Sequence, residues 1–439
     1  MERVGENDNF FELGGHSLLA PKIIARVQDA LGIEIPMRVM LASPTVGGMA
    51  RAIDAFRAGG DGAALAEAGV PDLEAEANLE PEIYPAGGDA ESVTSPQNIL
   101  LTGATGFLGA FLLRDLLRQT TARVFCLVRA SDREAGLRKL RVALTNYELW
   151  DEGQSSRIEP VLGDLARPLL GLPPDRFQEL SDKIDLIYHN GAFVNFSYPY
   201  AELKGANVLG TKEVLKLACR GRAKPLHYIS TVSIFSMRDA EESLLGEEVE
   251  PRHYEDLTMG YSQSKWVAER LVKIAASRGL PVSIYRPGTI TGDSRTGISN
   301  LDDFTCRYIK GCVELGQVPN LDEEMNIVPV DYVSGAVVHL SLRKESAGKI
   351  FHLVNPRPLG GGDQFAQWFT FLEEYGVRQV PYEQWRKALE GAPDNPLYTL
   401  LPTIPEWQGE EELMMQGRVM KRVRMRYECR NTLEMLAGT

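Results

Sequence analysis

The sequence lacks the features that mark membrane, secreted or disulfide-rich proteins. No run among its 439 residues is long and apolar enough to cross a membrane, and its start has no apolar signal segment. The five cysteines are odd in number, scattered, and without a Cys-x-x-Cys pair, so we expect reduced thiols and no structural zinc. We therefore predict a cytoplasmic protein with no membrane partner and no bound metal.

Positive charge is also in short supply. The chain carries 47 Lys and Arg against 60 Asp and Glu, and the net charge of −13 argues against generic nucleic-acid binding. Its content of 44% hydrophobic and 24% charged residues is typical of globular proteins. Because 439 residues are too many for one ordinary core, we expect two or three domains.

The acidic charge is concentrated between Gly59 and Ser95. That segment holds nine Asp or Glu and no Lys or Arg, and it is rich in Ala, Gly, Glu and Pro. With few large apolar residues, it is interpreted as a linker that is mobile at least in part. The alternative is a short helix over 63–68 that packs on a neighbour.

The most informative stretch is 99–109, ILLTGATGFLG, with glycines at G-x-x-G-x-x-G spacing. An apolar, β-rich run precedes the glycines, and apolar residues at helical spacing follow over 107–118. Gly103 suits a tight turn, Gly106 the approach of a pyrophosphate, and Gly109 the close packing of the helix. Phosphates bind the free N–H groups at such a helix start, so the pattern favours dinucleotide binding over plain packing.

The apolar run before the glycines is predicted to be the first of six strands. These strands are expected at 98–101, 123–128, 158–162, 186–189, 225–229 and 282–285. Their alternation with helices predicts an α/β fold with a Rossmann-like, doubly wound parallel sheet. Arg129 follows the second strand, where an acidic residue would bind the ribose of NAD, and a cation there suits the 2′-phosphate of NADP. Lys139, on the next helix, is a candidate for a second contact with this phosphate. For both Arg129 and Lys139, the alternative is an ordinary charged residue on the surface.

Tyr261 and Lys265 lie four residues apart on a predicted helix, 261–276, and therefore share a face. We expect the Lys265 ammonium to lower the phenol pKa from about 10, making Tyr261 a general acid near neutrality. Such a pair occurs by chance in many helices. Its place after a glycine-rich turn, five strands and the strand end Ser230-Thr231 favours a catalytic interpretation.

A small helical unit precedes the linker. The string Asp8-Asn-Phe-Phe-Glu-Leu-Gly-Gly-His-Ser-Leu-Leu-Ala20 opens an amphipathic run to Leu31, and a second run spans 46–56. Ser17 taken alone is compatible with a simple helix N-cap. The full string resembles the phosphopantetheine attachment site of peptidyl carrier domains, which implies 4′-phosphopantetheine on Ser17. Only seven residues precede the string, so we expect this carrier unit to lack its first helix.

Further strings resemble the terminal thioester reductase domains of nonribosomal peptide synthetases, within the extended short-chain dehydrogenase/reductase superfamily. They are Cys126-Leu-Val-Arg129, His189-Asn-Gly-Ala192, Tyr261-Ser-Gln-Ser-Lys265 and Tyr285-Arg-Pro-Gly288. The resemblance implies catalysis by Thr231, Tyr261 and Lys265. It implies that NADPH is bound by these last two and by Gly103, Thr105, Gly106, Phe107, Leu108, Gly109, Arg129, Lys139, Asp164, Leu165, Asn190, Ala192, Asn207, Pro287 and Ile290.

Two residues near this set have competing interpretations. Asn207 falls within a predicted helix, where Asn is usually exposed, and the resemblance implies instead that it organises a proton path. His189 we interpret as structural, because no metal-binding partner lies nearby in the sequence.

The expected domains are a carrier domain at 1–58, a linker at 59–95 and an NADP-binding domain at 96–290. Residues 326–355 are expected to return to the NADP-binding domain, and 291–439 to build mainly a smaller substrate-binding lobe. By the resemblance, the chain works with upstream synthetase modules and a phosphopantetheinyl transferase, and we expect it to be a monomer.

The chemistry that the resemblance implies is NADPH-dependent reduction of a carrier-bound acyl or peptidyl thioester. The hydroxyls of Thr231 and Tyr261 stabilise the developing oxyanion, Tyr261 donates the proton, and Lys265 holds the ribose and tunes Tyr261. The hemithioacetal then expels a thiol, which leaves far more readily than an amine or alkoxide. The product is an aldehyde, or an alcohol after a second round.

Two alternatives belong to other classes. A non-reductive release or cyclisation module is disfavoured by the presence of Thr231, Tyr261 and Lys265. An NAD-dependent nucleotide-sugar epimerase or dehydratase uses the same three residues, but Arg129 and the carrier unit argue against it. A basic run near the C-terminus suits either an acidic carrier or a solvated surface: Arg418, Lys421, Arg422, Arg424, Arg426 and Arg430.

Overall fold

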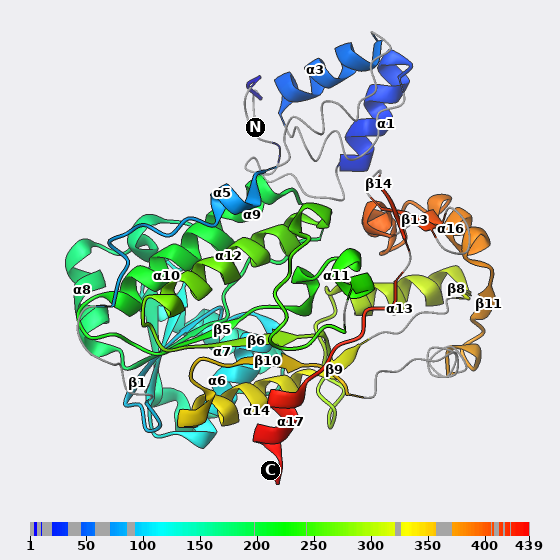
Figure 1. The fold of residues 1–439 in the computed structure, drawn as a ribbon. Helices are drawn as coiled ribbons and strands as arrows, with labels where there is room; N and C mark the ends of the chain where they lie inside the picture. The colour runs from blue at the N-terminus through cyan, green and yellow to red at the C-terminus, as the bar shows by residue number, and fades with distance from the viewer. Residues whose placement is uncertain are drawn as a thin grey trace.

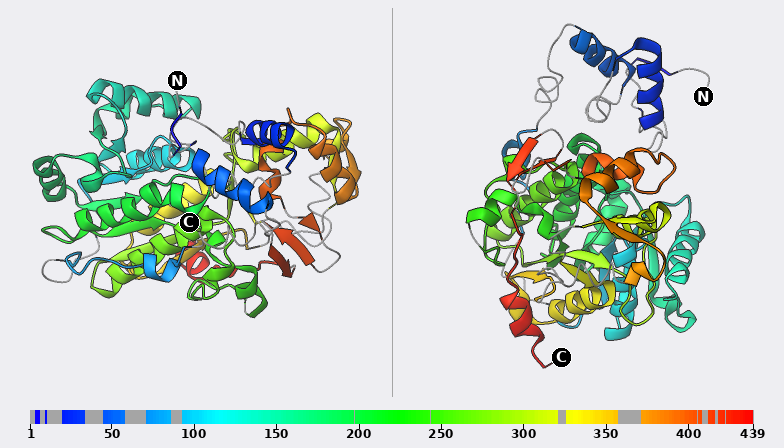
Figure 2. Two further views of the ribbon diagram at one scale, coloured as in Figure 1. Left: turned by 90° about the horizontal axis from the view of Figure 1, so that it is seen from above. Right: turned by 90° about the vertical axis from the view of Figure 1, so that its right-hand side faces the viewer.

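A computed structural model describes most of the chain (Figure 1). The described residues are 4–6, 10, 20–33, 45–57, 71–85, 93–196, 198–242, 244–320, 326–356, 371–404, 406–407, 412–415, 418–421 and 423–438. Within them, a pair of N-terminal helices stands at one end of a large α/β body, and the C-terminal helix lies at the other end (Figure 2).

The body is built on a seven-stranded sheet whose neighbouring strands are all parallel, in the order β10-β6-β5-β4-β1-β2-β3. The strands are β1 (Asn98–Thr102), β2 (Arg123–Val128), β3 (Ile158–Leu162), β4 (Leu186–His189), β5 (Leu226–Ile229), β6 (Val282–Pro287) and β10 (Ile350–Leu353). This order is that of a doubly wound Rossmann-like sheet, so the predicted fold class is confirmed. Six of the seven strands lie within a few residues of their predicted positions.

Side chains of successive strand residues enter two separate cores, one on each face of the sheet. Ile99 and Leu101 pack with helices α6 (Phe107–Gln119), α7 (Arg133–Asn146) and α14 (Val330–Ser341). Leu100 points the other way and packs with α8 (Pro174–Lys183), α10 (Gly210–Cys219) and α12 (Gly260–Ser277). This alternation is the period of two that a strand imposes, and it explains why apolar residues fill these strands without interruption.

Short helices connect the main elements of the body. They are η1 (Glu152–Arg157), η2 (Pro168–Gly171), α9 (Tyr200–Lys204), the π-helix η3 (Gly205–Leu209), η4 (Val232–Ile234), α11 (Met237–Glu242), η5 (Tyr254–Asp256) and η6 (Lys344–Ser346).

A smaller lobe follows β6 and surrounds the fully buried Trp385. It contains α13 (Phe304–Leu315), β8 (Gln317–Pro319), β11 (Arg378–Val380), α16 (Tyr382–Glu390) and η7 (Tyr398–Thr403). Strands β12 (Glu406–Trp407), β13 (Glu412–Met415) and β14 (Arg418–Lys421) form an antiparallel sheet.

The chain crosses between the lobe and the body more than once. Strands β7 (Thr289–Thr291) and β9 (Ile327–Pro329) pair in parallel and lead into α14, which packs on α6. The C-terminal helix α17 (Arg430–Leu436) packs on β10 and α14. Of the basic run, Arg424, Arg426 and Arg430 are exposed, and the side chains of its other members lie outside the described residues.

The N-terminal unit contains α1 (Ala20–Leu31) and α3 (Val46–Arg57), close to the two predicted helical runs. Met49 and Ile53 are buried against Ile23, Ile24 and Val27, so the amphipathic faces of the two helices meet. Ser17, most of its signature string and the alternative helix at 63–68 lie outside the described residues.

Residues 71–85 fall inside the predicted linker but pack against the body. This segment, called the strap below, contains α5 (Leu73–Glu76), whose N-cap Asp72 accepts a hydrogen bond from the Ala75 amide. Leu73, Leu79 and Ile83 are buried in the core under α10 and α12. The prediction of a linker rested on the acidic composition of the segment, in which these three apolar residues stand apart from one another.

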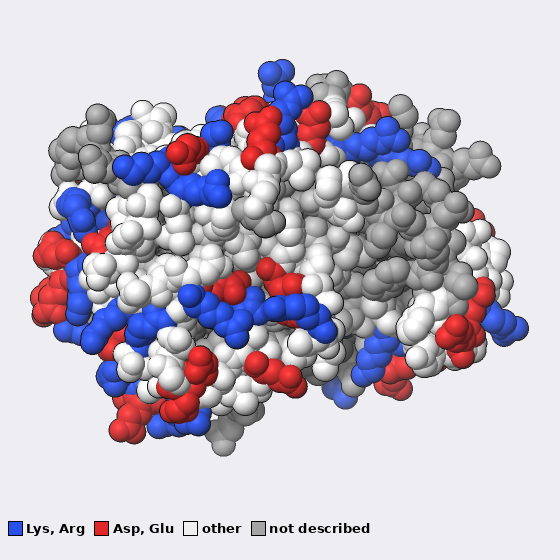
Figure 3. Space-filling model, turned by 90° about the horizontal axis from the view of Figure 1, so that it is seen from below, with Lys and Arg blue, Asp and Glu red and all other residues white. Residues whose placement is uncertain are grey.

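No helix in the described part of the chain is long and apolar enough to span a membrane. The face seen from below in Figure 3 carries basic and acidic side chains close together around an uncharged centre. The net negative charge is therefore not displayed as a single acidic field on this face.

The contact of α6 with β1 provides a stability test. A Cβ on Gly109 would lie 1.9 Å from the Gly103 carbonyl oxygen, whereas a Cβ on Gly335, inside α14, would meet nothing within 4 Å. Gly109→Ala is expected to lower the free energy of unfolding by about 2 kcal/mol or more, because backbone must move to admit the methyl group. Gly335→Ala is the control and is expected to be neutral or stabilising by up to about 1 kcal/mol. Urea unfolding that finds both variants equally stable would contradict the contact.

Candidate active site

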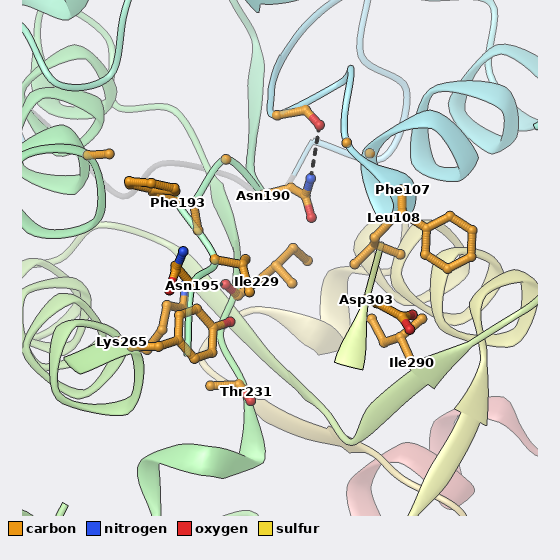
Figure 4. A pocket seen from close by; sticks show the side chains of 18 of the residues that line it. Phe107, Leu108, Asn190, Phe193, Asn195, Ile229, Thr231, Lys265, Ile290 and Asp303 are labelled. Carbon is orange, nitrogen blue, oxygen red and sulfur yellow. Dashed lines mark hydrogen bonds between the residues drawn. The ribbon is translucent and has the colours of Figure 1, made fainter. Parts of the chain in front are cut away.

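A cavity of about 1110 Å³ opens at the carboxyl ends of the parallel strands, where open α/β sheets bind ligands (Figure 4). It is lined by Thr231, Tyr261 and Lys265 and by most of the residues predicted to bind the dinucleotide. The latter are Gly103, Thr105, Gly106, Phe107, Leu108, Gly109, Arg129, Asp164, Leu165, Asn190, Ala192, Pro287 and Ile290. Lys139 and Asn207 do not line it.

One wall of the cavity is the start of α6. Gly103 has a φ of +73°, and a Cβ there would lie 2.7 Å from the Gly191 Cα, so only glycine suits this turn. Gly106 occupies the N-cap position of α6 but makes no side-chain hydrogen bond to the helix. The first N–H groups of the helix are therefore available to a ligand. The Asn190 amide donates a 3.4 Å hydrogen bond to the Gly103 carbonyl and joins the turns after β1 and β4 (Figure 4). This wall suits an anionic phosphate.

Arg129 and Asp164 lie where β2 and β3 end. Arg129 lines the cavity, and the Lys139 ammonium donates a 2.6 Å hydrogen bond to the Arg129 carbonyl oxygen. The Asp164 carboxylate accepts a hydrogen bond from the Ala166 amide, which fixes the loop after β3. Lys139 therefore supports the backbone of Arg129, and the cavity receives its positive charge here from Arg129.

The opposite wall holds the predicted catalytic residues. Tyr261 and Lys265 occupy the first turns of α12, and Thr231 follows β5, as predicted from the helix spacing and the strand end. The Lys265 ammonium donates a 2.7 Å hydrogen bond to the Ile229 carbonyl and lies 4.2 Å from the centre of the Tyr228 ring. The Thr231 hydroxyl accepts a hydrogen bond from the Ser233 amide. The Lys265 and Thr231 side chains are thus each held by a hydrogen bond.

The prediction that Lys265 lowers the pKa of Tyr261 is wrong in direction. Burial raises the pKa of Tyr261 to about 12, and burial lowers the pKa of Lys265 to about 7, against the opposing charge of Glu269. Desolvation disfavours the charged form of each group. Tyr261 consequently keeps its proton at neutral pH, which is the form that a proton donor requires.

Asn207 is buried in the π-helix η3 and forms hydrogen bonds with residues of two neighbouring segments. Its amide donates to the Phe193 carbonyl at 3.0 Å and to the Ser264 hydroxyl at 2.9 Å, and its oxygen accepts from the Phe193 amide at 2.7 Å. The expectation that a mid-helix Asn is usually exposed is wrong here. Through these bonds Asn207 ties the loop after β4 to the helix that carries Tyr261 and Lys265.

His189 is buried and fully hydrogen-bonded, as its structural interpretation requires. Its two ring nitrogens lie 2.9 Å from the hydroxyls of Thr102 and Thr211. Burial and the charge of Lys265 lower the pKa of His189 to about 3, so the ring is neutral. Thr102 in turn accepts a hydrogen bond from the Gly191 amide, which connects His189 to the turn at the cavity wall.

Sequence reasoning missed an aromatic group beside the catalytic residues. The Phe196 ring meets the Tyr261 ring edge to face at 5.6 Å between centroids, and the Phe304 ring at 6.4 Å. Both Phe196 and Phe304 line the cavity, with Phe193, Asn195 and Asp303 nearby in its lining. The sequence signal for Phe196 was the aromatic run after His189-Asn-Gly-Ala192, whereas Phe304 comes from the lobe and had none.

Two family models match the chain. The family described as male sterility protein matches residues 101–337, and the phosphopantetheine attachment site matches residues 1–53. The chain is 46% identical over 396 residues to one of the proteins that make up the linear gramicidin synthase of Brevibacillus parabrevis. This match covers 89% of the chain but only 8% of the much longer synthase protein.

Solved structures with similar folds include the terminal R domain from the myxalamid PKS-NRPS biosynthetic pathway. The identity is 44% and the TM-score 0.74, with 84% of this chain and 92% of that chain covered. A thiolation-reductase di-domain from an archaeal nonribosomal peptide synthetase is similar at 25% identity and a TM-score of 0.66, with 91% and 84% covered.

The Asn207 contacts predict a stability effect. Asn207→Ala leaves the Phe193 peptide groups without their partner inside the fold, and such a loss costs about 1–3 kcal/mol of unfolding free energy. Asn146→Ala, at the exposed end of α7, is the control and is expected to stay within about 0.5 kcal/mol of the unmodified protein. Chemical unfolding measures both, and equal stabilities would show that the Asn207 contacts contribute little.

Proposed function

Because this chain belongs to the family of terminal reductase domains of nonribosomal peptide synthetases, with their carrier domain at its N-terminus, we propose that it releases an acyl or peptidyl chain by reduction. The substrate is the thioester on the carrier, the reductant is NADPH, and the product is an aldehyde. One observation carries the proposal: a single cavity joins an uncapped helix start, an arginine at the end of β2, and Thr231, Tyr261 and Lys265.

The cavity residues fit a dinucleotide that carries a 2′-phosphate. The start of α6 offers N–H groups to the pyrophosphate, and Arg129 offers a cation to the 2′-phosphate. Gly191 leaves bare backbone in the cavity lining, because a Cβ there would lie 2.6 Å from the Leu165 side chain and 3.0 Å from the Thr102 hydroxyl. The bound NADPH supplies the hydride for the carbonyl carbon.

The residues on the α12 side act on the carbonyl oxygen of the thioester. The hydroxyls of Thr231 and Tyr261 donate hydrogen bonds to the oxygen as it gains negative charge, and Tyr261 gives it a proton. Lys265, anchored on the Ile229 carbonyl, positions the ribose and offsets negative charge on the phenol. The hemithioacetal then loses its thiol, whose pKa near 8.5 makes it a good leaving group.

The carrier unit supplies the substrate in this proposal. A phosphopantetheinyl transferase attaches 4′-phosphopantetheine to Ser17, and upstream synthetase modules load the arm with its acyl chain. The protein acts as a cytoplasmic monomer, with its five cysteines unpaired as a reducing compartment keeps them.

The proposal is tested with a synthetic acyl-pantetheine thioester. The chain is expected to oxidise NADPH and to form one aldehyde per NADPH consumed, with products identified by mass spectrometry. Formation of a free acid or a cyclised product without NADPH oxidation would contradict reductive release.

Tyr261→Phe removes the proton donor and keeps the ring packed on Phe196. Loss of general-acid help is expected to lower kcat by about a hundred- to ten-thousand-fold, while NADPH still binds. Tyr375→Phe, at an exposed position in the lobe, is the matched control and should keep full activity. Near-normal turnover by Tyr261→Phe would place the proton donor elsewhere.

Arg129→Ala removes the cation proposed for the 2′-phosphate. The KM for NADPH is expected to rise at least tenfold, about 1.4 kcal/mol of lost binding, while the KM for NADH changes little. Arg118→Ala, an exposed arginine at the end of α6, is the control. Equal use of NADPH and NADH by the unmodified protein would refute this role of Arg129.

A further inference from the structure

The strap, residues 71–85, has the contacts of a docked element along its whole length. Leu73, Leu79 and Ile83 are each no more than 3% exposed. The Arg278 guanidinium donates to the carbonyl oxygens of Leu79, Glu80 and Ile83 at 2.7–2.8 Å. A short acidic segment is therefore held by burial and by backbone hydrogen bonds, which are independent of its charge.

Ion pairs of Glu76 and Glu80 add to this anchoring of the strap. The Glu76 carboxylate lies 2.8 Å from the Lys204 ammonium and accepts a hydrogen bond from the Tyr200 hydroxyl. Glu80 lies 3.4 Å from Lys212. The acidic residues of the strap thus match lysines of α9 and α10, which explains part of the excess of acidic residues in this segment.

The two ends of the strap lie at different places relative to the cavity. Its first turn, α5, packs on α9 and α12 (Figure 1), and the residues next to the Lys204 anchor, Glu202 and Gly205, line the cavity. By contrast, the chain enters β1 at Asn98, where the Gln97 and Asn98 amides bind Asp185 before β4 begins. That is the amino edge of the parallel sheet, opposite to the cavity.

We propose that the strap moves the origin of the carrier tether from the amino edge of the sheet to the rim of the active-site cavity. This inference rests on the proposed function, because it concerns delivery of the carrier-bound thioester. With the strap docked, the tether is the thirteen residues 58–70, which span at most about 45 Å when extended. With the strap released, it is the 35 residues 58–92, and it starts on the far side of the sheet.

The size of the effect follows from tether length. The effective concentration of a tethered group falls roughly as the −3/2 power of tether length, so release of the strap lowers it about fourfold. The displaced origin adds to this loss. The strap is thus a positioning element, and it leaves the reaction of a freely diffusing thioester unchanged.

The test compares a variant that releases the strap with a control variant, both made in the full chain. Each of the two gains acidic side chains within the strap. Leu79→Asp/Ile83→Asp puts carboxylates into the core and is expected to release the strap, since burial of unpaired charge is strongly unfavourable. Tyr84→Asp is the matched control, because Tyr84 is 60% exposed in the same segment. Arg278→Gln, which removes the guanidinium from three strap carbonyls, serves as a second release variant if the first does not fold.

Each protein is loaded on its carrier with an acyl group and mixed with NADPH, and the aldehyde formed in a single turnover is timed. The release variants are expected to react at least fourfold more slowly than Tyr84→Asp, with faster hydrogen exchange of the strap amides. All proteins are expected to reduce a free acyl-pantetheine thioester at one rate. A release variant that matches Tyr84→Asp on the loaded carrier overturns the strap's role. Failure of the unmodified chain to reduce the free thioester overturns the proposed function instead.

Discussion

The close approach of α6 to β1 is the constraint on which the site depends. The Cα of Gly109 lies against the Gly103 carbonyl so tightly that no larger residue fits. This contact directs the uncapped start of α6 at the cavity, beside the turns that follow β2 and β4. Because the strands are parallel, their carboxyl ends bring Arg129, Asn190 and Thr231 to the same edge. Helix α12 adds Tyr261 and Lys265 to the lining of the same cavity.

The electrostatics of the site depend on burial more than on pairing. Lys265 and Tyr261 share a helix face, yet desolvation raises the tyrosine pKa to about 12 and lowers the lysine pKa to about 7. A tyrosine that keeps its proton serves as an acid, and a lysine near its pKa is readily stabilised as a cation by bound phosphate or phenolate. The sequence motif places the pair on one helix, as the structure shows, but it does not give the direction of the pKa shifts, which depends on residues distant in the chain.

Local patterns were sufficient to predict most of the body. Short apolar runs predicted six strands, glycine spacing predicted the turn before α6, and Tyr261 with Lys265 followed from helix spacing. What escaped prediction depends on contacts between distant segments. Phe304 reaches Phe196 from the lobe, Asn207 is buried in a π-helix where it binds the Phe193 peptide groups, and the strap is recognisable only once Arg278 is placed beside it.

In the proposed reaction, a hydride passes from NADPH to the thioester carbon within this cavity. The most direct measurement uses NADPH with deuterium at both C4 positions and an acyl-pantetheine thioester, followed by mass spectrometry of the released product. One deuterium is expected on the aldehyde carbon and none elsewhere in the acyl chain. An unlabelled product, or one released at the same rate without NADPH, would contradict it.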